Sequence, residues 1–289
     1  MRVPKLLIFN HIEAAKTIAS ITTKKMLKTS YSRAPFITHL KKEVRTPSKS
    51  LIFHYSNWVS ASQNKYKDRI PPHLFCQYAL PICIRQIAQT SYNLKTIINQ
   101  GCKLTVYQDI PCQTKLLLKV KIVEIEQTSK HALIHQVIYV HTKSRKLALK
   151  VDIYSKFLLS RSRSITRNPT NLDSFDTICQ WDISEQDGLN FAFLTGDFNP
   201  LHWLDPVAKK SIFKGKVLHG FGVFAKIYEQ IELFNKTQIK SVDVKFVRPA
   251  KIPSQNLQLL QEKTDSKVKS ICLKDKNNKV LLIGNVNLQ

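Results

Sequence analysis

The spacing of apolar side chains predicts a helix followed by several strands in the first half of the chain. Apolar residues recur at helical spacing over residues 72–90, after the pair Pro71-Pro72, and Pro81 is expected to kink or break this helix. Alternating apolar and polar residues then predict strands at 103–107, 115–124, 131–141 and 147–159. Such alternation is typical of an antiparallel sheet with one buried face.

The second half of the chain repeats this order of elements. Helical spacing predicts a long helix over residues 217–234. Alternation predicts strands at 240–247, 257–261, 267–273 and 280–286, with Asn277-Asn278 in the last hairpin turn. Segments 110–116 and 252–257 are also similar, each just after the first strand that follows a helix. The pattern predicts two copies of one α+β unit, each an antiparallel sheet wrapped round a long helix.

Four segments follow from these patterns. Residues 1–50 are predicted to be a basic, solvated N-terminal extension, since they contain eight Lys and three Arg against two Glu. Residues 51–160 form the first unit and residues 177–289 the second. Residues 161–176 are polar, contain Asn168-Pro169 and are predicted to be the linker.

The composition is that of a globular protein, with 43% hydrophobic and 22% charged residues. No run approaches the roughly 20 apolar residues that a membrane span needs. The six cysteines form no C-x-x-C pair, which favours reduced thiols and a cytoplasmic protein. The acid-poor stretch within residues 1–50 leaves import into the mitochondrial matrix as the alternative.

The formal net charge of +25 has three explanations. The lysines are scattered through every segment, so the charge can simply be spread over the surface. A basic surface also suits the phosphates of coenzyme A or an acidic acyl carrier protein. Nucleic acid is disfavoured as a partner, because the sequence has no basic-aromatic stripe and no zinc-finger spacing.

The segment 193–202 is the most informative for chemistry. Asn199 is a good N-cap and Pro200 a good first helical residue, so a short helix is expected to start there. Asp197 then lies on the entering loop and His202 in the first turn, where both can converge on one water for general acid–base catalysis. The alternative is an ordinary Asn-Pro turn in which Asp197 is an extra cap.

A second feature is the sequence V-L-H-G at the start of the long helix. The backbone N–H of Gly220 is expected at the helix N-terminus, where it can receive negative charge that develops on a thioester oxygen. Alternatively, Gly220 is small because helix and sheet pack closely. His219 is interpreted as structural rather than catalytic.

The string T-G-D-F-N-P-L-H, with the Gly of V-L-H-G 18 residues after its His, resembles the hydratase motif of MaoC-like proteins. These proteins include R-specific enoyl-CoA hydratases and 3-hydroxyacyl-thioester dehydratases of the hot-dog fold. The resemblance covers residues 181–253, including an F-x-x-P strand end within residues 244–250. It implies that Asp197 and His202 bind the catalytic water and that the Gly220 amide polarises the thioester carbonyl.

The first unit is only weakly similar to the degenerate first half of double-hot-dog dehydratases, and it has no D-x-N-P-x-H string. The implied fold is therefore a double hot dog with one active site. The implied reaction is reversible dehydration of a (3R)-3-hydroxyacyl thioester of coenzyme A or acyl carrier protein in fatty-acid metabolism. Residues expected to bind the substrate are Asn199, Lys214, Lys216 and Arg248.

No cofactor or metal is implied. The histidines show no zinc arrangement, and His131, His135 and His141 are expected on a solvated strand face. A homodimer is compatible with the sequence. Two other functions stay open: a hot-dog thioesterase, and a non-catalytic module that binds an acyl carrier or nucleic acid.

Overall fold

One antiparallel sheet of ten strands forms the centre of the computed structural model, which describes residues 3–12, 39–160 and 172–289. The strand order is β1-β3-β4-β5-β2-β7-β10-β9-β8-β6. The strands are β1 (Leu40–Arg45), β2 (Ile97–Val106), β3 (Lys115–Gln127), β4 (His131–His141), β5 (Leu147–Leu158), β6 (Phe175–Ile183), β7 (Ile239–Phe246), β8 (Ser254–Glu262), β9 (Val268–Lys274) and β10 (Val280–Leu288).

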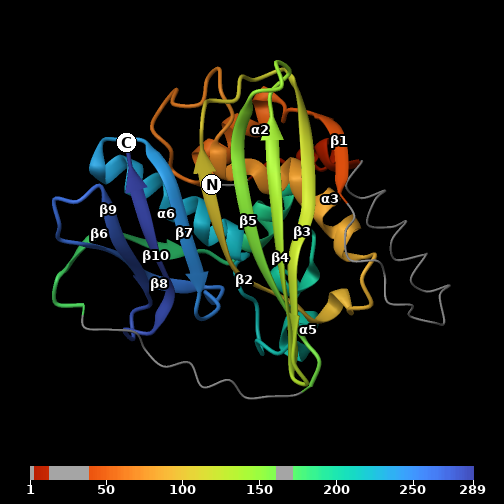
Figure 1. Ribbon diagram of the computed structural model, residues 1–289. Coiled ribbons are helices and arrows are strands. Elements are labelled where there is room, and N and C mark those ends of the chain that lie inside the picture. The colour runs from red at the N-terminus through yellow and green to blue at the C-terminus, as the bar shows by residue number, and fades with distance from the viewer. Residues whose placement is uncertain (1–2, 13–38, 161–171) are drawn as a thin grey trace.

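The helices gather on one face of this sheet. Figure 1 shows α2 and α3 behind the strands β3, β4 and β5, and α6 beside β7. The helices are α2 (Lys49–Trp58), α3 (Phe75–Ile87), α4 (Asp187–Thr195), α5 (Asp205–Lys210) and α6 (Gly220–Asn235). Short 3-10 helices are η1 (Lys5–His11), η2 (Pro72–Leu74), η3 (Leu94–Thr96) and η4 (Pro200–His202). No helix in the described ranges is long and apolar enough to cross a membrane.

The sheet consists of two halves, as the repeated order of elements predicts. Strands β1 to β5 belong to the first unit and β6 to β10 to the second. The halves join where β2 pairs with β7, from Gly101↔Lys245 to Thr105↔Ser241. A Cβ on Gly101 would lie 2.1 Å from the carbonyl oxygen of Val244, so this seam requires glycine there. The prediction of two antiparallel units paired edge to edge is confirmed.

Each half packs its sheet against a main helix. In the second unit, α6 buries Phe221, Phe224, Ile227, Tyr228 and Ile231, the apolar stripe that the sequence predicts. The helix begins at Gly220 rather than residue 217, because the preceding backbone is extended and Leu218 N–H bonds to the carbonyl of Ala250.

In the first unit, α3 runs through Pro81 without a break. The predicted break at Pro81 is therefore wrong. Buried residues on both sides of the proline, including Tyr78 and Ile82, offset the N–H that proline cannot donate.

The prediction of a solvated extension over residues 1–50 is wrong in its described parts. Leu40–Arg45 form an edge strand paired with β3, and α2 already begins at Lys49. Val3, Leu7 and His11 are buried against the body of the protein. Val3 precedes the 3-10 helix η1, and the three-residue repeat of such a helix does not align Leu7 with His11, so no pattern in this short segment predicts their burial.

Two further segments bear on the predicted organisation. Most of the predicted linker, residues 161–171, lies outside the described residues, as do residues 13–38 of the extension.

Strand β6 and helix α4 were not expected from the pattern. Asp187 at the start of α4 accepts a 2.7 Å hydrogen bond from the indole N–H of Trp58 on α2, which ties the second unit to the first.

A buried polar cluster also joins the two units. The carboxylate of Glu229 on α6 accepts hydrogen bonds from Tyr66 (2.5 Å) and Lys65 (2.6 Å), and it lies 2.7 Å from Nε2 of His73. Lys65 also contacts Glu232 at 2.6 Å. Burial alone would raise the pKa of Glu229, but the hydrogen bonds and charges of His73 and Lys65 outweigh it and lower the pKa to about 2. The first unit therefore supplies the partners of a buried charge in the second.

Candidate active site

The loop that carries Asp197 follows helix α4. Gly196 ends this helix in the left-handed conformation, with φ of 81° and its N–H bonded to the carbonyl of Ala192 at 2.8 Å. Asn199 caps the next short helix, η4, by accepting a 3.3 Å hydrogen bond from Leu201 N–H. The local structure thus agrees with the predicted Asn-Pro helix start: Asp197 lies on the loop two residues before the cap, and His202 is the last residue of η4.

His202 is held in a defined orientation and tautomer. Its Nδ1 lies 2.7 Å from the carbonyl oxygen of Val217. A carbonyl can only accept a hydrogen bond, so Nδ1 carries the proton. Nε2 therefore keeps its lone pair, and no residue in the described ranges bonds to it. Such a nitrogen can accept a proton from a bound water.

His219 links His202 to Asp197. The rings of His202 and His219 are stacked, with centroids 3.6 Å apart. Nε2 of His219 donates to the backbone carbonyl of Asp197 at 3.0 Å and lies 3.9 Å from its carboxylate. His219 itself is 3% exposed and packs against Phe191. His219 thus has the structural role that the sequence suggests: it holds both candidate catalytic residues in place.

Both imidazoles remain neutral at neutral pH. Burial lowers the pKa of His202, and this effect exceeds the opposing effects of the Asp197 charge and the Val217 carbonyl. Burial and the neighbouring His202 lower the pKa of His219 further. A neutral His202 is the form that can act as a base.

The pH dependence of activity should reflect this lowered pKa. Protonation removes the lone pair of His202, so kcat/KM for hydration should fall on the acid side, with its midpoint below the ordinary histidine value of 6.5. An enoyl thioester of N-acetylcysteamine suits the measurement, because this substrate carries no phosphate that titrates nearby. An acid limb centred above 6.5 would contradict the assignment of His202 as the base.

Gly220 is the first residue of α6, with His219 as N-cap. The carbonyl of His219 already accepts from the N–H groups of Gly222 and Val223. The N–H of Gly220 has no acceptor among the described residues, as expected in the first turn of a helix. A Cβ at Gly220 would lie 3.0 Å from the ring of Phe246, so close packing also favours glycine. Both interpretations of Gly220 are compatible with this geometry.

Two glycines and a tryptophan complete the surroundings of the site. A Cβ on Gly188 in α4 would lie 1.9 Å from the carbonyl oxygen of His202, so only glycine allows η4 to lie this close to α4. A Cβ on Gly222 would meet Phe191 and Trp58, each at 3.3 Å. Sequence reasoning missed Gly188, although a glycine inside a helix is a signal of close backbone approach.

The first unit reaches the site through helix α3. The thiol of Cys76, near the start of α3, has its pKa raised by burial and also by the negative charge of Asp197. The first unit also contacts the surroundings of the site through α2, since the ring centroids of Trp58 and Phe191 lie 5.3 Å apart and those of Phe191 and His219 4.8 Å apart. The candidate site therefore lies where the second unit meets the first.

The predicted substrate-binding residues lie in different surroundings. Lys214 and Asn199 are exposed. Lys216 is ion-paired with Glu185 at 2.6 Å and with Asp205 at 3.2 Å, so its charge is locally balanced. Arg248 donates a 2.9 Å hydrogen bond to the carbonyl of Val280. Lys214 forms no ion pair with the described part of the chain, whereas Lys216 forms two.

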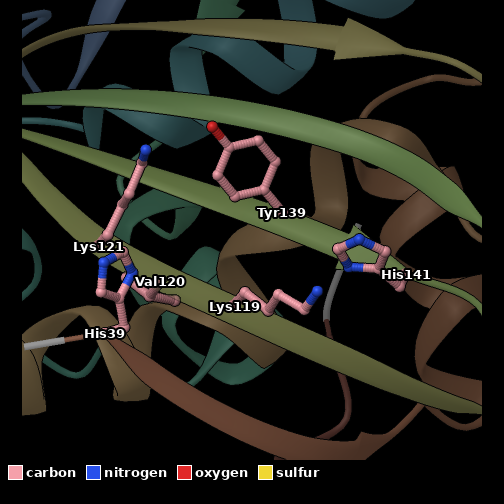
Figure 2. A pocket seen from close by; sticks show the side chains of 6 residues that line it. All are labelled: His39, Lys119, Val120, Lys121, Tyr139 and His141. Carbon is pink, nitrogen blue, oxygen red and sulfur yellow. The ribbon is translucent and has the colours of Figure 1, made fainter. Parts of the chain in front are cut away.

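A cavity of about 340 Å³ lies elsewhere, on β1, β3 and β4 of the first unit. Its lining residues are His39, Lys119, Val120, Lys121, Tyr139 and His141. Figure 2 shows the side chains of Lys119 and Lys121 pointing in different directions along their strand. None of the predicted site residues lines this cavity. Within the described residues no group of three or more His, Cys, Asp or Glu side chains is arranged to hold a metal.

Comparison with known families finds a match to the second unit. Residues 163–283 match the family model of the MaoC like domain. The family supports a hydratase or dehydratase role. A search of curated proteins finds no match.

Solved structures of similar fold cover most of the chain. HtdX of Mycobacterium tuberculosis is 15% identical, with a TM-score of 0.73 over 87% of this chain and 100% of that one. The peroxisomal multifunctional enzyme type 2 of Drosophila melanogaster is 20% identical, with a TM-score of 0.69 over 96% of this chain and 52% of that protein. Another Mycobacterium tuberculosis protein, described as a double hot dog, is 9% identical, with a TM-score of 0.59 over 90% and 98% of the two chains. The expected double-hot-dog fold is confirmed.

Proposed function

We propose that the protein catalyses the reversible dehydration of (3R)-3-hydroxyacyl thioesters to trans-2-enoyl thioesters in fatty-acid metabolism. The observation that carries this proposal is the free Nε2 of a neutral His202, set beside Asp197 near the N-terminus of α6. A base, a carboxylate and unpaired backbone amides are the groups that addition of water to an enoyl thioester needs.

In the hydration direction, His202 and Asp197 hold one water against Cβ of the substrate. As the water oxygen bonds to Cβ, Nε2 of His202 takes its proton, and the electrons of the double bond move to the thioester oxygen. The proton then returns to Cα, and the carbonyl re-forms. Since His202 and Asp197 share one water, they act as a coupled pair.

The backbone N–H of Gly220 is proposed to hold the enolate-like oxygen. It opens helix α6, where the helix dipole also favours negative charge. An oxygen bound there gains stabilisation that grows as charge develops in the transition state. Phe246 lies against Gly220 and would border the acyl chain.

The thioester carrier is proposed to be coenzyme A or acyl carrier protein, both of which are anionic. The exposed Lys209 and Lys210 end α5, and the exposed Lys214 lies between α5 and Val217, the partner of His202. The six free cysteines suit a reducing compartment, and we place the reaction in the cytoplasm or, alternatively, in the mitochondrial matrix.

The direct test is a hydration assay with enoyl thioesters of several chain lengths, on coenzyme A and on acyl carrier protein. Loss of the enoyl absorbance without release of free thiol supports the proposal. Release of thiol would identify a thioesterase instead. A wild-type protein that changes none of these thioesters would refute the proposal.

Lys214→Glu is expected to raise KM for an enoyl-CoA by roughly three- to tenfold at low ionic strength, because it reverses a charge three residues before Val217, the partner of His202. The difference should shrink above about 0.1 M salt, where the screening length is about 10 Å. Lys236→Glu is the matched control. Lys236 is exposed at the opposite end of α6, about 24 Å from Gly220 for a helix of this length. Equal effects of both substitutions would contradict a local role of Lys214.

A further inference from the structure

The N-terminal segment 3–12 lies against the loop that carries Asp197. Val3 and Leu7 are 3% and 6% exposed and belong to the main hydrophobic core. His11, at the end of η1, is 3% exposed. On the other side of η1, Leu6 is 74% exposed. The side chains of Val3, Leu7 and His11 are therefore packed into the protein, whereas Leu6 faces solvent.

The ring of His11 supplies a hydrogen bond to the end of helix α4. Its Nε2 lies 2.8 Å from the carbonyl oxygen of Phe193, 182 positions further along the chain. The last four carbonyls of a helix have no partner within the helix, and Phe193 is among them. Because a carbonyl only accepts, Nε2 of His11 carries the proton.

The other ring nitrogen is consistent with this tautomer. The side-chain amide of Gln77, on helix α3 of the first unit, lies 3.5 Å from Nδ1 of His11 and can donate to it. Burial lowers the pKa of His11 more than the Phe193 carbonyl raises it, so the ring is neutral. His11 thus accepts from the first unit and donates to the second.

The same ring covers the turn immediately before Asp197. A Cβ on Gly196 would lie 2.9 Å from Nδ1 and 3.0 Å from Cγ of His11. The ring also meets Phe198 edge-on, with centroids 6.4 Å apart. The residues on either side of Asp197 therefore both contact His11.

A second contact fixes the segment itself. The hydroxyl of Ser48 donates a 3.1 Å hydrogen bond to the side chain of Asn10, next to His11. Ser48 is also the N-cap of α2, where its oxygen accepts from Leu51 N–H. The position of His11 is therefore tied to the first unit from both Asn10 and Gln77.

We propose that His11 is a positioning residue for the proposed hydration reaction: it fixes the Gly196–Phe198 turn and thereby the carboxylate of Asp197. This inference rests on the proposed function for its effect on turnover, but its effect on the turn does not. The N-terminal segment is then a component of the catalytic unit. It contacts the turn rather than the reacting atoms.

The kinetic test compares three variants on an enoyl thioester. His11→Ala removes the hydrogen bond and opens space above Gly196, and kcat is expected to fall about 10- to 100-fold with KM unchanged. His11→Gln can offer an amide N–H to the Phe193 carbonyl and should recover much of kcat. Leu6→Ala changes an exposed residue of the same segment and should match the wild type. A kcat of His11→Ala within about twofold of the wild type would overturn the inference.

A second measurement is independent of activity. Hydrogen exchange of the peptide that contains residues 193–199 should be faster in His11→Ala than in the wild type, at a temperature where both are folded. The exchange of helix α6 should stay the same. Unchanged exchange of residues 193–199 would overturn the inference. If the wild type proves inactive on thioesters while His11→Ala still accelerates this exchange, the proposed function fails and the role of His11 in holding the turn stands.

Discussion

Asp197→Asn and His202→Ala are each expected to lower the turnover of an enoyl thioester by about two to four orders of magnitude, the range for loss of a positioned acid–base group. Because both side chains act on one water, the double variant should lose little more than the worse single variant. Steady-state hydration rates of the purified proteins provide the measurement.

A control in the same unit is Ser211→Ala, which removes side-chain hydrogen bonds at the end of α5 without touching the proposed base or carboxylate. It should cost about 1 kcal/mol of stability and leave turnover near that of the wild type. Near-normal activity of either single catalytic variant would remove that residue from the mechanism. Additive losses in the double variant would show that the two residues act on separate steps.

Glu229→Gln should give the largest loss of stability among the substitutions considered. The neutral side chain removes the charge shared by Lys65 and His73 and leaves Lys65 paired with Glu232 alone; breaking a buried pair in this way typically costs about 3–5 kcal/mol. Urea unfolding of the wild type and the variant measures this difference. Asp243→Asn is the control, because its contact with Lys103 is half exposed at 3.9 Å and should contribute roughly 0–1 kcal/mol.

The same substitution should change the response to acid. The pKa of Glu229 is lowered from 4.5 to about 2, so its contribution is complete above pH 4.5 and is lost as pH falls toward 2. Glu229→Gln should lack this part of the acid dependence. An identical acid transition in the two proteins would show that Glu229 is not stabilised by its partners.

Patterns with a short period predicted the fold well. Strands β3, β4 and β5 and helix α6 coincide closely with the predicted ranges, because each alternates or repeats over ten or more residues. Strand β1 has six residues and helix α4 nine, which is too little for a periodic signal. Both elements depend on neighbours that are distant in sequence, and no local pattern records those neighbours.

In the candidate site, too, the sequence predicted the residues that are set by local geometry and missed those that depend on distant partners. Asp197 and His202 were predictable because five residues and one Asn-Pro cap set their geometry. His11 contacts Phe193 across 182 positions and His73 contacts Glu229 across 156, so nothing near either residue in the sequence points to its partner. The pairing of Lys216 with Glu185 was hidden for the same reason.

The β2–β7 seam has a consequence for how the two halves can differ. In an assembly of identical subunits, every substitution appears on both sides of the seam, and dilution can separate the sides. Here the seam is unimolecular, so its strength does not depend on protein concentration. Each half can also change alone. The half without the Asp/His pair is thereby free to specialise in bracing the other, with Trp58, His73 and Gln77 as its contributions.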